Sequence, residues 1–318
     1  MGPRLVFSMF FGNPSMRTYT LAFYPANITL DAVALVERLG RLPLALVFVG
    51  SYISKTSITK YLELYSESWK KLHGTMKSRY DYPERTIITT WQISFDELNL
   101  KDEGAAKLLR LWGYLDNHEL WYQLLLWKRY EKVAPSWLRK ITATEISFLA
   151  TVEILLNYSL VEKNDNGETY SMHAVVHDWI RESINKEKDE GLSQIAITTI
   201  GLAVPGYSER YSATMQRRLL PHIIQCTRLL GQPSEIQDNV DQEAYLSSLD
   251  KLGRLYTRQT WLTEAEAMYK QVLPGSEKVL GKEHTLTLNT AHNLATLYQN
   301  KGRLTEAEAM YNRALTGS

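Results

Sequence analysis

Residues 261–273 read WLTEAEAMYKQVL, and residues 303–315, 42 positions further along the chain, read RLTEAEAMYNRAL. The correspondence extends toward the N-terminus, because 12 of the 22 positions in residues 252–273 are identical in residues 294–315. Self-similarity at a fixed period of this length is typical of repeat proteins, in which each unit buries its apolar face against the next. The sequence therefore predicts two consecutive repeat units at the C-terminal end of a mainly helical protein.

Each unit is predicted to form a pair of helices. In the first helix the apolar side chains recur at i, i+3 and i+4, which places them on one helix face, and in the second helix they recur at i, i+4 and i+8. These stripes consist of Leu252, Leu255, Tyr256 and Ala265, Tyr269, Leu273 in the first unit, and of Leu294, Leu297, Tyr298 and Ala307, Tyr311, Leu315 in the second. We expect them to form the core of the repeat rather than contacts with a ligand.

Individual residues predict how these helices begin, approach one another and end. Gly253 is small enough for a neighbouring helix to approach closely, and Gly302 suits a helix C-terminus. Thr263 and its equivalent Thr305 are predicted to cap the second helices, because a threonine oxygen can accept a hydrogen bond from a free backbone amide. Pro274 is predicted to shorten or kink its helix, since proline has no amide hydrogen to donate.

This pattern resembles the tetratricopeptide repeat, in the 42-residue form found in kinesin light chains. The packing positions of that repeat are matched in order by Leu252, Gly253, Tyr256, Ala265 and Tyr269. The resemblance implies an α-solenoid that binds a protein or peptide. Because a solenoid needs about three or more units and a capped end, we expect an exposed apolar edge over residues 307–315, open to self-association, and a truncated gene product.

The region before the repeats is predicted to have a core of its own, because seven of the eight tryptophans lie between Trp69 and Trp179. Apolar spacing predicts helices within residues 31–73, 87–126 and 144–156. Residues 160–163 and 170–172 are typical of two short strands, and Asn166-Gly167 between them is a strong hairpin signal. Helices followed by a hairpin indicate a winged-helix domain.

Two short motifs in this region resemble those of NB-ARC modules. Residues 41–46, RLPLAL, resemble the GLPLAL motif of the helical ARC segment, and residues 172–179, MHAVVHDW, resemble the MHD-type motif that ends the winged helix. Together with the repeats they resemble fungal NB-ARC–tetratricopeptide proteins of the NOD-like receptor (STAND) class. That family works as a switch, closed by ADP and opened by ATP, whose repeats sense a ligand. The resemblance implies that Pro43 approaches the nucleotide base and His173 the diphosphate.

The residues that normally hold a nucleotide's phosphates are missing from the sequence. It contains no G-x-x-x-x-G-K-[ST] loop, and no apolar strand ending in paired aspartates that could hold magnesium. In the MHD-type motif, Ala174 stands where aspartate is usual. We therefore expect no enzymatic activity and no cofactor, with ADP or ATP bound only if a complete nucleotide-binding core is supplied.

Other classes of site find little support. His173 and His177 have the i, i+4 spacing of a metal-binding pair, but no third ligand is nearby, so no metal site is expected. The helix predicted over residues 144–158, which would be the recognition helix of a winged helix, has no Lys or Arg. Since Lys plus Arg (36) also balance Asp plus Glu (35), we expect no nucleic-acid partner. Cys226, the single cysteine, is expected to be a buried, inert thiol.

The predicted organisation has five parts. They are a divergent N-terminal stub (1–30), an ARC-like helical segment (31–75), a winged-helix domain with a small β-hairpin (76–185), a helical linker (186–235) and the two repeat units (236–318). No apolar run approaches the roughly 20 residues that span a bilayer, so we expect a cytoplasmic protein with no membrane partner. The favoured function is non-catalytic binding of a protein or peptide, as in the sensor half of a NOD-like receptor. Two alternatives stay open, an ADP/ATP switch completed by a missing core and a cargo adaptor like a kinesin light chain.

Overall fold

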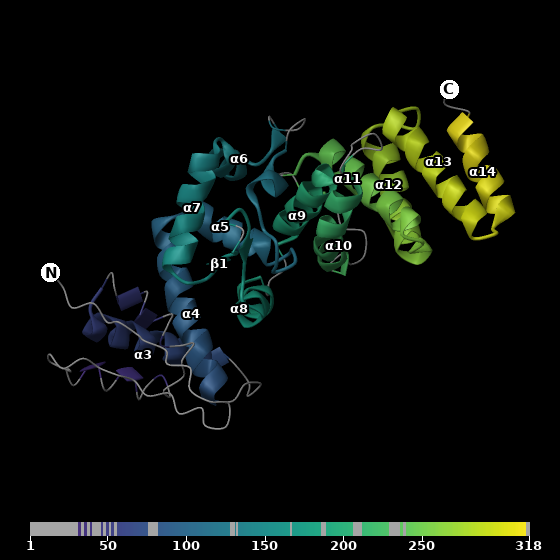
Figure 1. Ribbon diagram of the computed structural model, residues 1–318. Helices are drawn as coiled ribbons and strands as arrows, with labels where there is room; N and C mark the ends of the chain where they lie inside the picture. Colours follow the sequence, from purple (N-terminus) through teal and green to yellow (C-terminus); the bar gives the residue numbers. More distant parts are fainter. Residues whose placement is uncertain are drawn as a thin grey trace. The chain divides into compact units, whose positions relative to one another are not determined.

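The computed structural model describes residues 31–32, 35–36, 39, 46, 49–50, 52–53, 56–75, 82–127, 131, 133–165, 167–185, 189–205, 212–228, 236–237 and 240–315. These residues are mainly helical, with one small hairpin among them (Figure 1). They divide into two compact units. The first contains the described residues up to Glu103 together with Ile154–Val161, and the second contains Gly104–Glu153 and the residues from Glu162 onward.

The first unit is built on α3 (Ile58–Thr75) and α4 (Tyr82–Lys101), which pack against each other. Its core is aromatic. Tyr61 is fully buried, and the centroid of its ring lies 5.2 Å from that of Tyr52 and 6.3 Å from that of Tyr65. On α4, Trp91 is fully buried as well. The prediction of helices is confirmed for the described part of this segment.

The second unit begins with four short helical elements around a further aromatic cluster. They are α5 (Glu103–Trp112), the 3-10 turn η1 (Tyr122–Leu125), α6 (Ser136–Thr142) and α7 (Glu145–Asn157). The ring of Phe148 packs against those of Trp112 and Tyr170, with centroids 6.4 and 6.0 Å away. The apolar residues of α5 and α7 thus form the separate core that the tryptophan distribution predicts.

The predicted hairpin is present but shorter than expected. Strand β1 (Glu162–Lys163) pairs antiparallel with β2 (Tyr170–Ser171), in the register Glu162↔Ser171 and Lys163↔Tyr170. Gly167 has a φ of +72°, which a glycine adopts without steric cost, whereas Asn166 lies outside the described residues. Tyr170 also exchanges two backbone hydrogen bonds with Leu120, at 2.8 and 2.7 Å. That additional bridge has no signal in the sequence.

A buried helix connects the hairpin region to the repeats. The chain passes through α8 (Ala174–Trp179) and the π-helical turn η3 (Ile180–Ile184) into α9 (Glu190–Ala203) and α10 (Ser212–Arg228). Every residue of α9 from Gly191 to Gly201 is buried, because the helix packs on η1, α10 and α11 at once. Its polar side chains are satisfied there. Thr199 accepts a hydrogen bond from the Trp127 indole at 3.0 Å, for example.

The C-terminal region consists of packed helix pairs. Helices α11 (Gln242–Arg258) and α12 (Leu262–Val279) form the first pair, and α13 (Thr285–Asn300) and α14 (Leu304–Leu315) form the second. They follow one another as a stack in Figure 1, and α12 packs against α13. A Cβ atom added to Gly253 would lie 2.7 Å from a ring carbon of Tyr269, so the predicted close approach at this glycine is confirmed. Because α9 and α10 already pack together and α9 packs on α11, the stack begins before the first repeat.

The turns between paired helices repeat atom for atom, and they show that the predicted threonine caps are wrong. Thr260 and Gly302 occupy equivalent positions with φ of +61° and +74°. The amide of the next residue, Trp261 or Arg303, then donates to a tyrosine carbonyl of the preceding helix at 2.9 Å. This closed turn starts α12 and α14 at leucines, so that Thr263 lies inside its helix rather than at the N-cap. Gly302 ends its helix as predicted.

Pro274 does not shorten its helix. α12 has 18 residues and continues to Val279, five residues beyond the proline. A proline inside a helix removes one backbone hydrogen bond. Here burial of Leu273 on one side of it and Ser276 on the other holds the helix on its neighbours through the break. The predicted shortening is therefore wrong.

Candidate protein-binding surface

The exposed residues of α11 and α13 form one candidate binding surface, which we call the α11–α13 face. The two helices are first members of their pairs, and their exposed or half-exposed positions correspond at an offset of 42 residues. The residues of the face are Glu243, Ser247, Lys251, Arg254 and Arg258 on α11, and Thr285, Asn289, Asn293, Thr296 and Asn300 on α13. Because the opposite sides of α11 and α13 are buried against neighbouring helices, packing holds the backbone of the face in position.

Asp250 joins the two helices beneath this face. Its carboxylate accepts hydrogen bonds from the Thr290 hydroxyl at 3.2 Å and the Asn293 amide at 3.0 Å, both on α13. On its own helix it pairs with Arg254 at 3.2 Å. Burial raises the pKa of the Asp250 carboxyl, against the opposing effect of Arg254. Asp250 thereby fixes the position of one side chain of the face on each helix.

The charge of the face is uneven. On α11 the three cations Lys251, Arg254 and Arg258 follow one another at i, i+3 and i+7, with the carboxylate of Glu243 at the start of the helix. On α13 the equivalent positions hold asparagines and threonines, which are neutral and can both donate and accept hydrogen bonds. The face therefore places Lys251 and Arg258, together with the Asp250-paired Arg254, beside a row of polar groups.

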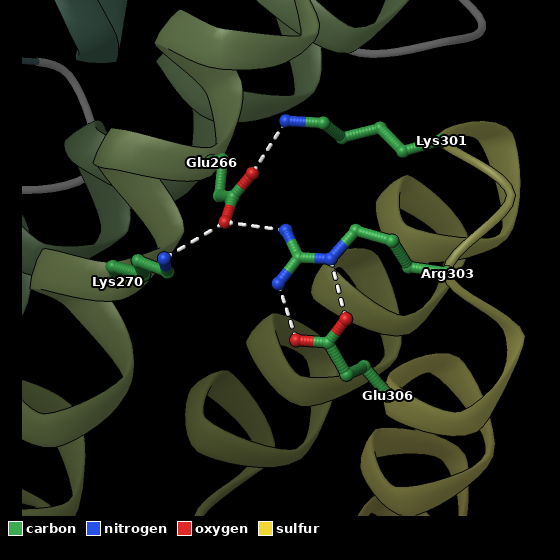
Figure 2. A network of polar contacts seen from close by, with 5 residues as sticks. All are labelled: Glu266, Lys270, Lys301, Arg303 and Glu306. Carbon is green, nitrogen blue, oxygen red and sulfur yellow. Dashed lines mark hydrogen bonds and ion pairs between the residues drawn. The ribbon is translucent and has the colours of Figure 1, made fainter.

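A second group of charges ties the two repeat units together (Figure 2). Glu266 of α12 lies between Lys270 of its own helix, at 2.8 Å, and two cations from the turn before α14. These are Lys301, at 2.5 Å, and Arg303, at 2.8 Å, and Arg303 also pairs with Glu306. Burial raises the pKa of the Glu266 carboxyl, but the hydrogen bonds from these cations outweigh it and lower the pKa to about 2. This group holds the scaffold rather than offering a site.

The structure describes one of the two residues predicted to bind nucleotide. Pro43 lies outside the described residues. His173 is exposed, and its Nδ1 accepts a hydrogen bond from the Val175 amide at 3.3 Å, which caps α8. Its remaining ring nitrogen is the one that could donate to an anion. The nucleotide role of both residues stays a prediction.

His173 and His177, which have the i, i+4 spacing of a metal-binding pair, lie in different environments. His177, unlike His173, is buried, and its Nε2 lies 2.8 Å from the Leu115 carbonyl oxygen. Burial lowers the pKa of His177, so it is neutral at neutral pH. Among the residues that the structure describes, no three His, Cys, Asp or Glu side chains gather as metal ligands would.

Cys226 is buried as predicted. Its thiol lies 3.3 Å from the carbonyl oxygen of Tyr114, and burial raises its pKa well above the ordinary value. The reactive thiolate is therefore disfavoured. None of the described helices is long and apolar enough to cross a membrane.

Asp250 is the residue of the candidate surface that sequence reasoning misses. It lies between Leu249 and Leu252 in a helix whose apolar stripe is clear, and a single polar residue at its edge is usually solvated. The only signal in the sequence is that α13, the equivalent helix of the next unit, carries the polar residues Thr290 and Asn293 to which Asp250 bonds.

Comparison with known proteins supports two parts of this description. Residues 241–318 match the sequence profile of the tetratricopeptide repeat, and residues 94–189 match that of a domain of unknown function, DUF7779. The chain is also 22% identical over 277 residues to a "Nucleotide-binding leucine-rich repeat (NLR)-like protein" of Hyaloscypha variabilis (strain UAMH 11265 / GT02V1 / F). That alignment covers 82% of this chain and 25% of the relative, so the chain spans about a quarter of its length.

No solved structure matches the chain. The helix pairs α11–α12 and α13–α14 are therefore identified by their sequence and packing together. They are a tetratricopeptide repeat region, in a chain that is distantly related to a fungal NLR-like protein.

Proposed function

We propose that the chain is a non-catalytic binding protein, and that its α11–α13 face holds an extended, acidic segment of a partner protein. The observation that carries the proposal is that α11 presents Lys251, Arg254 and Arg258 beside the polar row on α13, with Asp250 holding Arg254 and Asn293 in place. Tetratricopeptide repeats point to protein binding in general. The Lys and Arg side chains of the face narrow this to a partner segment that is acidic.

The spacing of the cations fits an extended chain. Lys251 and Arg258 are seven residues apart, which is about 10 Å along a helix axis at 1.5 Å per residue. An extended peptide covers that distance in about three residues. Acidic side chains two or three residues apart can therefore meet successive cations of α11, while Asn289 and Asn293 of α13 are placed to bond the peptide backbone.

The distant relative supports a regulatory setting for this binding. We propose that the chain acts as the partner-sensing part of an NLR-like protein, since the repeats lie in the same chain as the DUF7779 region. Helix α9 provides the physical connection, because it packs on α11 of the repeats and on η1 of the preceding region. A shift of α11 on partner binding would therefore alter the packing of α9, and through α9 that of η1 in the preceding region.

Fluorescence anisotropy with a labelled dodecapeptide of alternating Glu and Ala tests the binding proposal. The peptide is expected to bind the wild-type chain, more weakly as salt is raised. The double variant Lys251→Glu, Arg258→Glu should weaken binding at least tenfold. A matched variant, Lys140→Glu, Lys282→Glu, changes the net charge equally at exposed sites elsewhere. The proposal is wrong if both variants lose affinity equally, or if an alternating Lys–Ala peptide binds as well.

A further inference from the structure

Helix α7 has an exposed apolar side that the binding of an acidic segment does not use. Its inner side is buried through Phe148 and Val152. On its outer side, Ile146 is 79% exposed and Leu149 is 44% exposed, and Ala150 beside them is exposed as well. Large side chains of this kind, contiguous on one helix, often mark a contact surface. We call these three residues the α7 patch.

The charges around the α7 patch restrict what can cover it. Glu145 and Glu153 are exposed, Glu145 directly before Ile146 and Glu153 one turn after Leu149 and Ala150, and α7 contains no Lys or Arg. The patch is therefore apolar with an acidic border.

A second copy of the chain is a poor occupant of this surface. If two α7 helices packed in parallel, each glutamate would face its own counterpart. If they packed antiparallel about Leu149 and Ala150, Glu145 of one copy would come close to Glu153 of the other. Like charges facing each other across an interface oppose association. The border thus selects against self-association and favours a cationic partner.

We propose that the α7 patch binds an amphipathic helix of a partner protein, whose apolar stripe is flanked by Lys or Arg. The stripe would cover Ile146 and Leu149, and the flanking cations would meet Glu145 and Glu153. Ala150 lets the two helix axes approach closely, at the 8–10 Å typical of packed helices. Such a helix lying on an apolar surface is a common form of recognition.

The test uses the full chain and a labelled 18-residue helix of Leu and Lys, with the leucines at helical spacing. A second peptide replaces every Lys by Glu and keeps the leucines. The Lys peptide should bind the wild-type chain at least tenfold more tightly than the Glu peptide. Ile146→Glu and Leu149→Glu should each weaken binding of the Lys peptide at least tenfold, because they place a charge in the apolar contact.

Leu100→Glu serves as the matched control, since Leu100 of α4 is 87% exposed and far along the chain. It should change affinity less than twofold, and thermal unfolding should show that all three variants fold. Equal losses in the control and the α7 variants would overturn the proposal. So would equal binding of both peptides, or a dimer in sedimentation that Leu149→Glu dissociates, because a second copy would then be the occupant. The Lys251→Glu, Arg258→Glu variant should bind the Lys peptide normally, which separates this site from the α11–α13 face.

Discussion

The two repeat units carry the same motif but bury it to different extents. Tyr269 of α12 is 1% exposed, whereas its equivalent Tyr311 of α14 is only half-buried. Leu273 is 7% exposed and Leu315 is 68% exposed. The difference does not come from the residues themselves, since TEAEAMY is identical in both helices. It comes from α13, which packs on α12, so the environment of a repeat is set by its neighbour.

Equivalent residues of the two units should therefore contribute differently to the free energy of unfolding, and the same substitution made in each unit can show this. The largest difference is expected for the tyrosines. Tyr269→Ala should lower the free energy of unfolding by about 3–4 kcal/mol, because it opens a cavity in the core. Tyr311→Ala should cost about 1 kcal/mol. Guanidinium denaturation followed by circular dichroism measures both, and equal costs would show that α14 is as well covered as α12.

The close approach at Gly253 predicts a second asymmetry. Gly253→Ala should destabilise by about 2 kcal/mol, because the added methyl group overpacks against the Tyr269 ring and this outweighs the gain in helix propensity. Ala295→Gly, the reverse change at the equivalent buried site, should cost about 1 kcal/mol from helix propensity and lost burial. A stabilising Gly253→Ala in thermal unfolding would mean that the helices are further apart than described.

Glu266 and Glu308 occupy equivalent positions in the two units, but only Glu266 pairs with Lys301 and Arg303. Glu266→Gln should destabilise by about 1 kcal/mol after solvent screening, whereas the exposed Glu308 should tolerate Gln with little change. Because the folded pKa of Glu266 is lowered to about 2, its contribution is present above about pH 4.5 and is lost as pH falls toward 2. Stability measured from pH 6 to pH 2.5 should show this loss in the wild type and not in Glu266→Gln.

The turns give the smallest expected effect, with opposite signs in the two units. Thr260 is a β-branched residue at a φ of +61°, where Gly302 lies at +74° in the second unit. Thr260→Gly should stabilise the chain by up to about 1 kcal/mol, and Gly302→Thr should destabilise it by a similar amount. If neither variant shifts the unfolding midpoint, the left-handed turns are not under strain.

The sequence predicts well what depends on a local pattern. The two units, the buried stripe of the first unit, Gly253, Gly302 and the hairpin all follow from spacing or from one residue's backbone preference, and the structure confirms them. The predictions that fail concern competition between local and tertiary effects. Thr263 can cap a helix, but the closed turn after Thr260 starts α12 earlier, and Pro274 breaks a hydrogen bond in a helix that its packing holds in place.

The binding surface is less predictable from sequence because it combines distant residues. The cations of α11 are visible as single residues, yet only packing places them beside the polar row of α13. The link through Asp250 depends on a contact across 43 residues to Asn293. Likewise, α9 reads as an apolar helix, and its burial on every side becomes clear only when η1, α10 and α11 surround it.

The most direct test of the proposed function is hydrogen–deuterium exchange of the full chain with and without the Glu–Ala dodecapeptide. Amides of α11 and α13 should become more protected on binding, with a smaller effect on α9, which packs on α11. Those of α14, which packs on α13, should show a similarly small effect, and those of α7 should be unchanged. Protection confined to α14 or α7, or none at saturating peptide, would contradict the assignment of partner binding to the α11–α13 face.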